Sequence, residues 1–241
     1  MSEQEWFASW FDSPYYPILY QHRDYSEAES FIRHLLSFLG PDKDSHFLDL
    51  ACGRGRHSVF INRHGYKVTG LDLSPDSIAD AKKNIAENLS FGVHDMRDPL
   101  PGQFTFILNM FTSFGYFDDQ GDNLKVLHNV RKALLPDGRF VLDFMNVEQV
   151  IPRLVAEEEK ELNGIHFGLR RSVKDGFIVK DIEVRDGDKS YAFQERVQAL
   201  DRNAFSNLFA QAGLEVVHIW GDYHGGEFSA ENSPRLIYFC R

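Results

Sequence analysis

Hydrophobic and polar positions follow two different spacings along the first part of the chain. Short apolar runs, as in buried strands, alternate with segments in which apolar residues recur every three or four positions, as on one face of a helix. The expected strands of this region cover residues 47–51, 67–71, 89–93, 104–110 and 139–144. Strands that alternate with helices predict a parallel, doubly wound α/β sheet.

Start and stop signals bound the helices between these strands. Ser74 followed by Pro75 is typical of the first turn of a helix, and Gly40-Pro41 is typical of a helix end. The expected helices cover residues 26–39, 74–87, 122–135 and 201–212, with one more between the glycine turn at 52–55 and about His64.

The pattern changes near residue 160. Residues 161–199 hold strand-like runs that are separated by Lys174-Asp175-Gly176 and Asp186-Gly187-Asp188, which are hairpin turn sequences. This stretch is therefore expected to be an antiparallel β insertion after the fifth strand. Residues 214–221 and 235–240 are the last two expected strands.

Residues 46–72 are the stretch around which the chain is organised. A buried strand leads into the turn that holds Gly53 and Gly55, a helix follows, and a second strand ends at Asp72. Glycine lacks Cβ, so the backbone can turn sharply and let a ligand approach closely. A carboxylate at the tip of the second strand can accept both hydroxyls of a ribose. This βαβ unit predicts a nucleoside site.

Two residues of this unit argue against a dinucleotide. Ser58 stands where the dinucleotide fingerprint has its third glycine, and Asp49 places a carboxylate beside the turn. That carboxylate would repel a pyrophosphate but could attract an ammonium group.

The run Leu48–Gly55, with Gly70–Ser74 downstream, closely resembles the first motif of class I S-adenosylmethionine-dependent methyltransferases. The segment Pro14–Tyr20, with Arg23 after it, resembles the N-terminal segment of glycine and amino-sugar N-methyltransferases, which closes over the cofactor. The resemblance implies S-adenosyl-L-methionine as cofactor and S-adenosyl-L-homocysteine as product. It also implies a Rossmann-like methyltransferase fold, with a seven-stranded, mostly parallel sheet that ends in an antiparallel hairpin.

Under this interpretation residues 1–241 form a single methyltransferase domain. Residues 1–40 are the segment and helix that cover the cofactor or substrate, and residues 41–158 are the cofactor-binding α/β core. Residues 159–200 are the β insertion, expected to act as a substrate lid. Residues 201–241 supply the C-terminal helix and hairpin.

Ligands of open α/β sheets bind at the carboxyl ends of the strands. In the resembled family the acid at the position of Asp72 binds the ribose, and the pair at Asp95 and Met96 holds the adenine. Arg23 is the candidate partner for the carboxylate of the cofactor, and Arg54, Arg56 and His57 beside the turn are the alternatives. The full set of expected cofactor-binding residues is Tyr20, Arg23, Asp49, Ala51, Cys52, Gly53, Gly55, Asp72, Leu73, Ser74, Asp95, Met96, Asn109 and Met110.

The acceptor pocket is expected beyond Asn109. The run 112–117 and the glycine-rich loop 221–228 are expected to line it, so the candidate substrate residues are Phe114, Tyr116, Tyr223 and His224. His224 is also the candidate catalytic base, which is needed only if the acceptor arrives protonated. The cofactor already carries an activated methyl group, so the protein mainly aligns the reactants and excludes water.

Charge and motifs narrow the class of acceptor. Lys and Arg number 26 against 36 Asp and Glu, a formal net charge of −10, which argues against a general nucleic-acid binder. DNA amino-methyltransferases need an Asn/Asp-Pro-Pro-aromatic run after the fourth strand, and Asn109–Thr112 lacks both prolines and the aromatic residue at the fourth place. The expected acceptor is a nitrogen or oxygen of a small molecule; a protein or an RNA is the alternative.

Other features exclude some chemistry. Cys52 and Cys240 are too few for a disulfide framework and have no metal-site spacing, so no metal is expected. No signal-peptide pattern and no long apolar run occurs, so a cytoplasmic location without a membrane partner is expected. Two further alternatives remain. One is a non-catalytic module that binds an adenosyl nucleoside. The other is an NAD-dependent oxidoreductase, which Ser58 and the late hairpin disfavour.

Overall fold

The structure is a computed structural model that describes residues 6–21 and 25–241. The strands of its larger sheet are β1 (His46–Leu50), β2 (Lys67–Asp72), β3 (Leu89–Val93), β4 (Phe104–Asn109), β5 (Leu134–Met145), β10 (Val216–Trp220) and β11 (Arg235–Cys240). They lie in the order β10-β11-β5-β4-β1-β2-β3. The first five strands run parallel, and β11 is antiparallel to both β5 and β10. The predicted seven-stranded sheet with a terminal antiparallel hairpin is thus confirmed.

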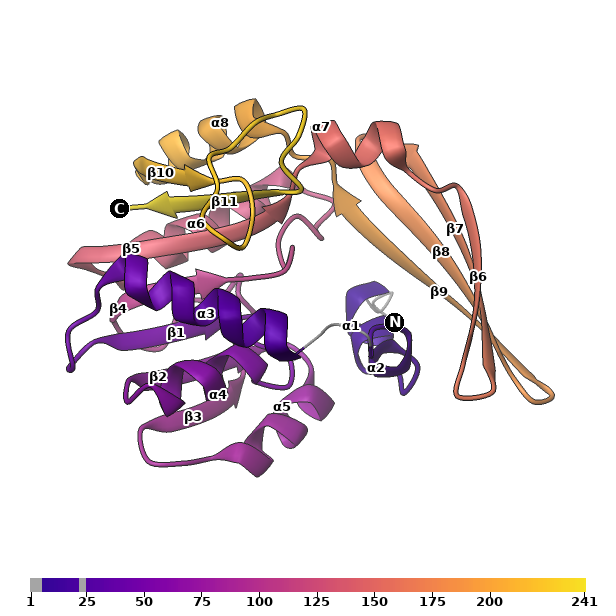
Figure 1. Ribbon diagram of the computed structural model, residues 1–241, viewed down its shortest axis with the longest axis horizontal. Coiled ribbons are helices and arrows are strands. Elements are labelled where there is room, and N and C mark those ends of the chain that lie inside the picture. Colours follow the sequence, from indigo (N-terminus) through magenta and orange to yellow (C-terminus); the bar gives the residue numbers. More distant parts are fainter. Residues whose placement is uncertain (1–5, 22–24) are drawn as a thin grey trace.

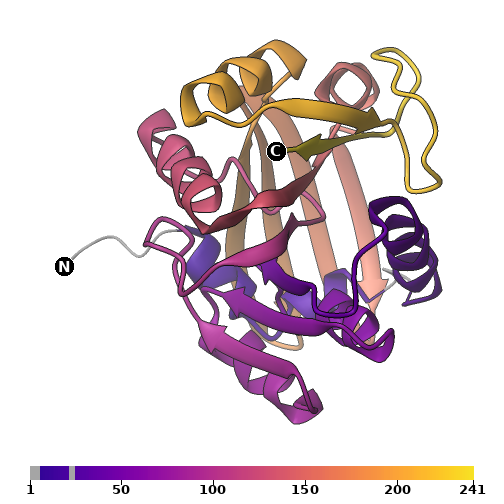
Figure 2. The ribbon, with the colours of Figure 1, turned by 90° about the vertical axis from the view of Figure 1, so that its left-hand side faces the viewer.

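Helices cover both faces of this sheet. Figure 2 shows α6 and α8 on one face and α3 and α4 on the other. The helical segments are α1 (Trp6–Phe11), α2 (Tyr16–Leu19), α3 (Tyr25–Leu39), α4 (Arg56–Arg63), α5 (Pro75–Ala81), α6 (Gln120–Ala133), α7 (Val147–Val150), α8 (Arg202–Ala212) and the 3₁₀ turns Lys82–Asn84 and Ile151–Arg153. None of the helices among the described residues is long and apolar enough to cross a bilayer.

Helix α5 ends earlier than the sequence predicts. It begins as expected, because the Ser74 hydroxyl accepts the Ser77 amide and Pro75 occupies the first turn. Residues 82–88 are all exposed, so they offer no apolar face to pack against the sheet. Most helical stability in proteins comes from such packing, and the helix accordingly stops at Ala81.

Strand β5 begins before the predicted turn at Pro136-Asp137-Gly138. Leu134 pairs with Phe104 and Arg139 pairs with Phe106, so the intervening residues bulge out of the ladder instead of separating helix from strand. A Cβ on Gly138 would lie 3.0 Å from the carbonyl oxygens of Leu135 and Thr105, which explains the glycine there.

A second sheet follows β5. Its strands are β6 (Glu157–Leu162), β7 (Ile165–Lys174), β8 (Phe177–Asp186) and β9 (Lys189–Gln198), antiparallel and in chain order. The predicted antiparallel insertion is confirmed, with both predicted hairpin turns. Its first strand and the turn at Asn163-Gly164 were not predicted. Figure 1 shows this sheet beside the larger one, with α1 and α2 between the two.

Three hydrophobic clusters hold these layers together. One lies between the larger sheet and α6 and α8, and a second lies on the opposite face, under α3 and α4. Strand β1 contributes to both clusters, because Leu48 packs in the first cluster and Phe47 packs in the second. The third joins Trp10, Tyr15 and Leu19 of the N-terminal segment to the inner face of the four-stranded sheet. We call residues 6–20 the N-terminal cap.

Candidate functional site

A cavity of about 510 Å³ lies at the carboxyl edge of the larger sheet. Its walls are the ends of β1, β2 and β3, the segment after β4, the N-terminal cap, β9 and the start of β11. The strand order reverses between β1 and β4, which is where open α/β sheets bind their ligands. The volume lies in the range of small-molecule sites.

The glycine turn forms the floor of the cavity. Ala51, Gly53 and Gly55 all have positive φ, at 62°, 53° and 77°. A Cβ on Gly53 would meet no atom within 4 Å, and Gly53 itself lines the cavity. A Cβ on Gly55 would lie 2.6 Å from the ring of Phe91, below the turn. Gly53 therefore leaves space for a ligand, whereas Gly55 allows the turn to pack on the core.

Asp72 is fixed beside this turn. Its Oδ2 accepts the Gly53 amide at 2.7 Å, and its Oδ1 accepts the Ser74 amide at 2.9 Å. Burial raises the pKa of Asp72, against the opposing effect of these backbone hydrogen bonds. A carboxylate has about four lone-pair positions, so Asp72 can still accept two hydroxyl groups from the cavity.

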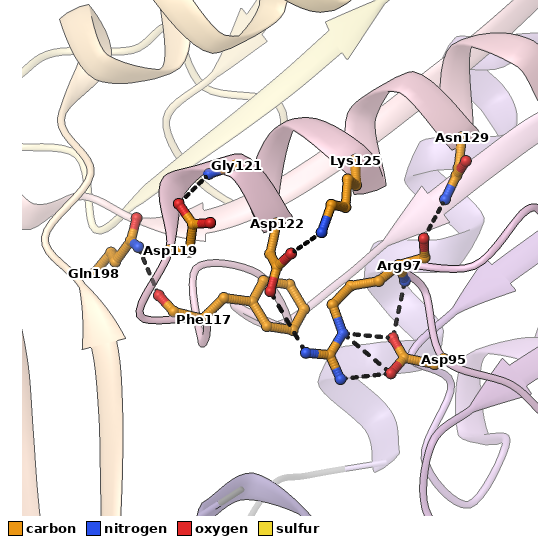
Figure 3. Close-up of polar contacts among 9 residues, drawn as sticks. All are labelled: Asp95, Arg97, Phe117, Asp119, Gly121, Asp122, Lys125, Asn129 and Gln198. Carbon is orange, nitrogen blue, oxygen red and sulfur yellow. Dashed lines mark hydrogen bonds and ion pairs between the residues drawn. The ribbon is translucent and has the colours of Figure 1, made fainter.

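Asp95 and Met96 form the wall past β3, and Arg97 holds Asp95 in place. Figure 3 shows the guanidinium of Arg97 facing the carboxylate, with Nε 3.0 Å from Oδ1 and Nη2 2.6 Å from Oδ2. The guanidinium lies over the ring of Phe117 at 4.9 Å. Burial would raise the pKa of Asp95, but its contacts with Arg97 outweigh that effect and the pKa falls below its usual range.

A second brace fixes this loop from behind. Asn129 of α6 donates from Nδ2 to the carbonyl oxygens of Arg97 at 2.9 Å and Asp98 at 2.8 Å. Figure 3 shows Asn129 reaching the loop from the helix. The wall that includes Asp95 is therefore held in shape without a ligand.

Most of the predicted residues come together at this cavity. Those that line it are Tyr20, Ala51, Gly53, Asp72, Leu73, Ser74, Asp95, Met96, Tyr116 and Tyr223. Arg23 lies outside the described residues. Five further predicted residues lie beneath the site rather than in its wall: Asp49, Cys52, Gly55, Asn109 and Met110.

Two of these buried residues brace the floor. Asp49 accepts the Ser58 hydroxyl at 2.6 Å and the Ser58 amide at 3.1 Å, so it fixes the start of α4. Asn109 donates from Nδ2 to the carbonyl oxygens of Leu50 at 3.0 Å and Ser113 at 3.1 Å, so it joins β1 to the segment after β4. Neither side chain reaches the cavity.

Two predicted acceptor residues lie elsewhere. Phe114 is buried in the core and packs near Phe205 of α8, with ring centroids 6.0 Å apart. His224 is exposed, and its amide donates to Asp222 within the loop at 2.8 Å. Neither residue lines the cavity, so the structure offers no geometry in which His224 serves as a base.

Thr112, Ser113 and Phe117 of the run expected to line the pocket also line the cavity. The structure adds cavity residues that the sequence did not single out: Trp6, Phe7, Phe11, Asp12, Tyr16, Leu50, Ser77, His94, Phe111, Met145, Glu195, Val197 and Arg235. The many aromatic residues in the N-terminal segment were a sequence signal for Trp6, Phe7, Phe11 and Tyr16. Asp12, Glu195 and Arg235 belong to no local motif, and only the tertiary fold brings them to the cavity.

Glu195 of β9 joins the N-terminal cap to the four-stranded sheet. Its Oε1 accepts the indole N–H of Trp10 at 2.7 Å and the hydroxyl of Tyr20 at 2.6 Å. The ammonium of Lys180 donates to the same Tyr20 hydroxyl at 2.5 Å. Asp12 adds a second link, since it accepts the Ser74 hydroxyl at the start of α5.

Asp143 of β5 organises the opposite end of the cavity. This fully buried carboxylate accepts Nε of Arg235 at 2.8 Å, the hydroxyl of Tyr223 at 3.0 Å and the amide of Phe111 at 2.8 Å. Phe111 and Thr112 both have positive φ, at 57° and 62°, which is uncommon for residues other than glycine. Asp143 thus holds a strained turn in the cavity wall.

These residues fit an adenosyl nucleoside. Asp72 presents acceptors for a ribose, Asp95 presents one for the exocyclic amine of a base, and Gly53 leaves room for the chain that follows the ribose. The cavity continues past Thr112 and Tyr116 to the N-terminal cap, where a second reactant has room. No cluster of three or more His, Cys, Asp or Glu side chains suited to a metal occurs among the described residues.

Comparisons with known proteins show what the chain is similar to. The family described as "Methyltransferase domain" matches residues 41–213. The chain is 25% identical over 235 residues to the putative methyltransferase YqeM of Bacillus subtilis. The aligned region covers 92% of this chain and 92% of that one. It is 30% identical over 194 residues to a dTDP-3-amino-3,6-dideoxy-alpha-D-glucopyranose N,N-dimethyltransferase of Streptomyces fradiae, over 76% of this chain and 75% of that one.

Among solved structures, an S-adenosylmethionine-dependent methyltransferase from Clostridium acetobutylicum has the same fold. The TM-score is 0.80 at 18% identity, over 94% of this chain and 95% of that one. The two-sheet architecture described above is therefore a Rossmann-like methyltransferase fold, as the sequence predicted.

Proposed function

The chain belongs to the methyltransferase domain family and is an S-adenosylmethionine-dependent methyltransferase; on that premise we propose that it methylates an amino nitrogen of a small molecule. The observation that carries the choice of nitrogen is the wall of the cavity beyond the cofactor residues. There the aromatic rings of Trp6, Phe11, Tyr16 and Tyr116 line the same cavity as the carboxylate of Glu195.

Aromatic faces and carboxylates both attract cations. An ammonium within about 6 Å of an aromatic ring gains about 0.5–2 kcal/mol, and a partly buried carboxylate adds a charge-assisted hydrogen bond. A neutral hydroxyl group can donate a hydrogen bond to the carboxylate but gains no attraction between a cation and the aromatic faces. The amino-sugar specificity of the Streptomyces fradiae relative supports the same proposal.

The cofactor-binding residues in this proposal are those at the strand ends. Asp72 binds the ribose, Asp95 and the amide after it bind the adenine, and the turn at Gly53 faces the methionine portion. When bound, the cofactor supplies a methyl group on a positively charged sulfur. The chain orients it by hydrogen bonds that are already in place, such as those of Asp72 to Gly53 and Ser74.

The transfer itself is an in-line displacement. The nitrogen lone pair forms the new N–C bond while the C–S bond breaks, and its electron pair stays on sulfur in S-adenosyl-L-homocysteine. An ammonium must lose a proton first. Glu195 is the carboxylate of the acceptor end that can receive this proton or pass it to water.

The N-terminal cap and residues 159–200 form the lid in this proposal. Trp10, Tyr15 and Leu19 pack against the inner face of the four-stranded sheet, so cap and insertion share one hydrophobic cluster. Together they cover the acceptor end and exclude water. The proposed division is a covering segment and helix at 1–40, a core at 41–158, the insertion at 159–200 and a C-terminal part at 201–241, all in one cytoplasmic domain.

A methyl-transfer assay with matched acceptors tests the proposal. Wild-type protein is incubated with methyl-labelled S-adenosylmethionine and with pairs of amines and alcohols that share one carbon skeleton, alongside total protein and total RNA. The proposal expects label in amines. Label confined to alcohols, protein or RNA would contradict it. Cofactor binding without any transfer would favour the non-catalytic alternative.

A further inference from the structure

We propose that Arg235, with the hydroxyl of Thr112, forms a subsite for an anionic group of the acceptor, a carboxylate or a phosphate. The acceptor would then carry an amine near Glu195 and an anion at Arg235. This inference rests on the proposed function and narrows its acceptor class.

Arg235 is the one Lys or Arg side chain among the described residues that line the cavity. Four side chains that line the same cavity carry carboxylates: Asp12, Asp72, Asp95 and Glu195. The whole chain carries a formal net charge of −10, so a free anion would be repelled from most of its surface. A guanidinium at one end of such a cavity therefore selects where an anionic group can lie.

Asp143 fixes the orientation of this guanidinium. Nε and Nη2 of Arg235 lie 2.8 and 2.7 Å from Oδ1 of Asp143. Asp143 is fully buried behind the guanidinium, and the Arg235 side chain is 17% exposed, so the arginine is the charge at the cavity surface. The guanidinium also lies over the ring of Tyr223, with its central carbon 5.5 Å from the ring centroid. An arginine held in this way loses little entropy on binding an anion.

Thr112 supplies a second donor. Its Oγ1 accepts Nη2 of Arg235 at 3.0 Å, which leaves the hydroxyl hydrogen to donate to a ligand in the cavity. Thr112 reaches this place because the backbone at Phe111 and Thr112 is left-handed. Strain of this kind costs about 1–3 kcal/mol per residue and collects at functional sites. The Thr112 amide donates to the carbonyl oxygen of Asp143 at 2.9 Å, which stabilises the turn.

The subsite lies at the far end of the cavity from the proposed nucleoside residues. In the sheet order, β11 is four strand spacings from β2, about 19 Å, so Arg235 and Asp72 enter the cavity from opposite ends. An anion at Arg235 would therefore lie away from the ribose and base, and prior loading with S-adenosyl-L-homocysteine separates it from the cofactor's own carboxylate.

Titration of the protein loaded with S-adenosyl-L-homocysteine tests the inference. Inorganic pyrophosphate and succinate are the two probes, which separate phosphate from carboxylate recognition. We expect saturable binding of at least one probe to the wild type. Arg235→Lys, which keeps the charge but loses the planar fork, should weaken it at least about tenfold.

Two further variants keep the test interpretable. Asp143→Asn with Arg235→Gln removes both charges, so it leaves no unpaired buried carboxylate, and it should abolish binding of the probe. Arg171→Lys is the matched control, because the Arg171 side chain is 18% exposed and pairs with Glu158 at 2.6 Å but lies outside the cavity. It should bind the probe as the wild type does.

Three results would overturn the inference. One is the absence of saturable binding of either probe to the loaded wild type, and another is equal binding by the double variant. The third is a loss of S-adenosyl-L-homocysteine affinity in Arg235→Lys with unchanged binding of the probe, which would assign Arg235 to the cofactor. Failure of the wild type to bind S-adenosyl-L-homocysteine at all would instead contradict the proposed function.

Discussion

The carboxylate of Asp72 accepts the amide of Gly53 at 2.7 Å, although 19 positions of the chain separate them. This bond ties the carboxyl end of β2 to the glycine turn after β1. In the proposed function, the acceptor for the ribose and the space for the rest of the nucleoside are therefore set by one contact. A contact that is already formed costs no ordering when a ligand binds, which favours tight binding.

Gly53→Ala should weaken cofactor binding more than it weakens the fold. A Cβ there meets no protein atom within 4 Å and projects into the space for the ligand, while the positive φ of 53° costs about 1–2 kcal/mol. We expect S-adenosyl-L-homocysteine affinity to fall at least about tenfold, measured by calorimetry. Affinity equal to that of the wild type would show that the ligand does not approach this glycine.

Gly55→Ala should weaken the fold more than it weakens cofactor binding. Its Cβ would lie 2.6 Å from the Phe91 ring at a φ of 77°, so turn and core must both shift. The free energy of unfolding should fall by about 2–4 kcal/mol in urea denaturation, as overpacking and a left-handed alanine add. Gly168→Ala is the control, since its Cβ would have only an ordinary contact at 3.7 Å. Similar losses in both variants would refute this explanation.

The central βαβ unit was predictable because its contacts are local or between neighbouring strands. The turn residues, the two strands and Asp72 follow from glycine conformation, apolar runs and a strand-end acid within residues 46–72. The acceptor end was not predictable in the same way. Arg235 and Asp143 are 92 positions apart, and Tyr20 and Glu195 are 175 apart. Only the pairing of β11 with β5 and the folding of β9 over the N-terminal cap bring them to the cavity.

The prediction that Phe114 lines the acceptor pocket was wrong because of the local backbone geometry. The run after β4 was expected to line the pocket, and Thr112, Ser113 and Tyr116 do. The left-handed turn at Phe111 and Thr112 reorients the chain, and Phe114 enters the core instead. Nothing in the sequence marks two consecutive residues other than glycine as left-handed.

Asp49 should make stability depend on pH in a particular direction. Burial raises its pKa from 3.8 to about 6, partly offset by the hydrogen bonds from Ser58 and reinforced by Asp72. The folded state then binds the proton more tightly than the unfolded state, so stability falls as pH rises from about 4 to 6. The loss reaches about 3 kcal/mol above that window.

Asp49→Asn removes this titration and keeps an acceptor for the Ser58 amide. Both proteins are denatured at several values across pH 4–7. The free energy of unfolding of the variant should rise relative to that of the wild type as pH increases from about 4 to 6. Asp44→Asn, at an exposed position, serves as control. Parallel stability curves for Asp49→Asn and the wild type would exclude the proposed burial cost.

Trp10→Phe should loosen the N-terminal cap alone. It keeps an aromatic ring but loses the indole bond to Glu195 at 2.7 Å, and a hydrogen bond to a charged partner is worth about 1.5–3 kcal/mol. Hydrogen exchange should become at least about tenfold faster in residues 6–20 and stay unchanged in β1–β4. Tyr238→Phe is the control, because the buried Tyr238 hydroxyl has no hydrogen-bond partner in the described structure. Uniformly faster exchange along the chain would argue against a separate cap.

The most direct test of the central claim is calorimetric titration with S-adenosyl-L-methionine, S-adenosyl-L-homocysteine and NAD, for the wild type and Asp72→Ala. We predict saturable binding of the two adenosyl compounds, no binding of NAD, and affinity at least about tenfold weaker in the variant, because hydrogen bonds to a charged acceptor are lost. Binding of NAD, or adenosyl binding that is indifferent to Asp72, would contradict the account.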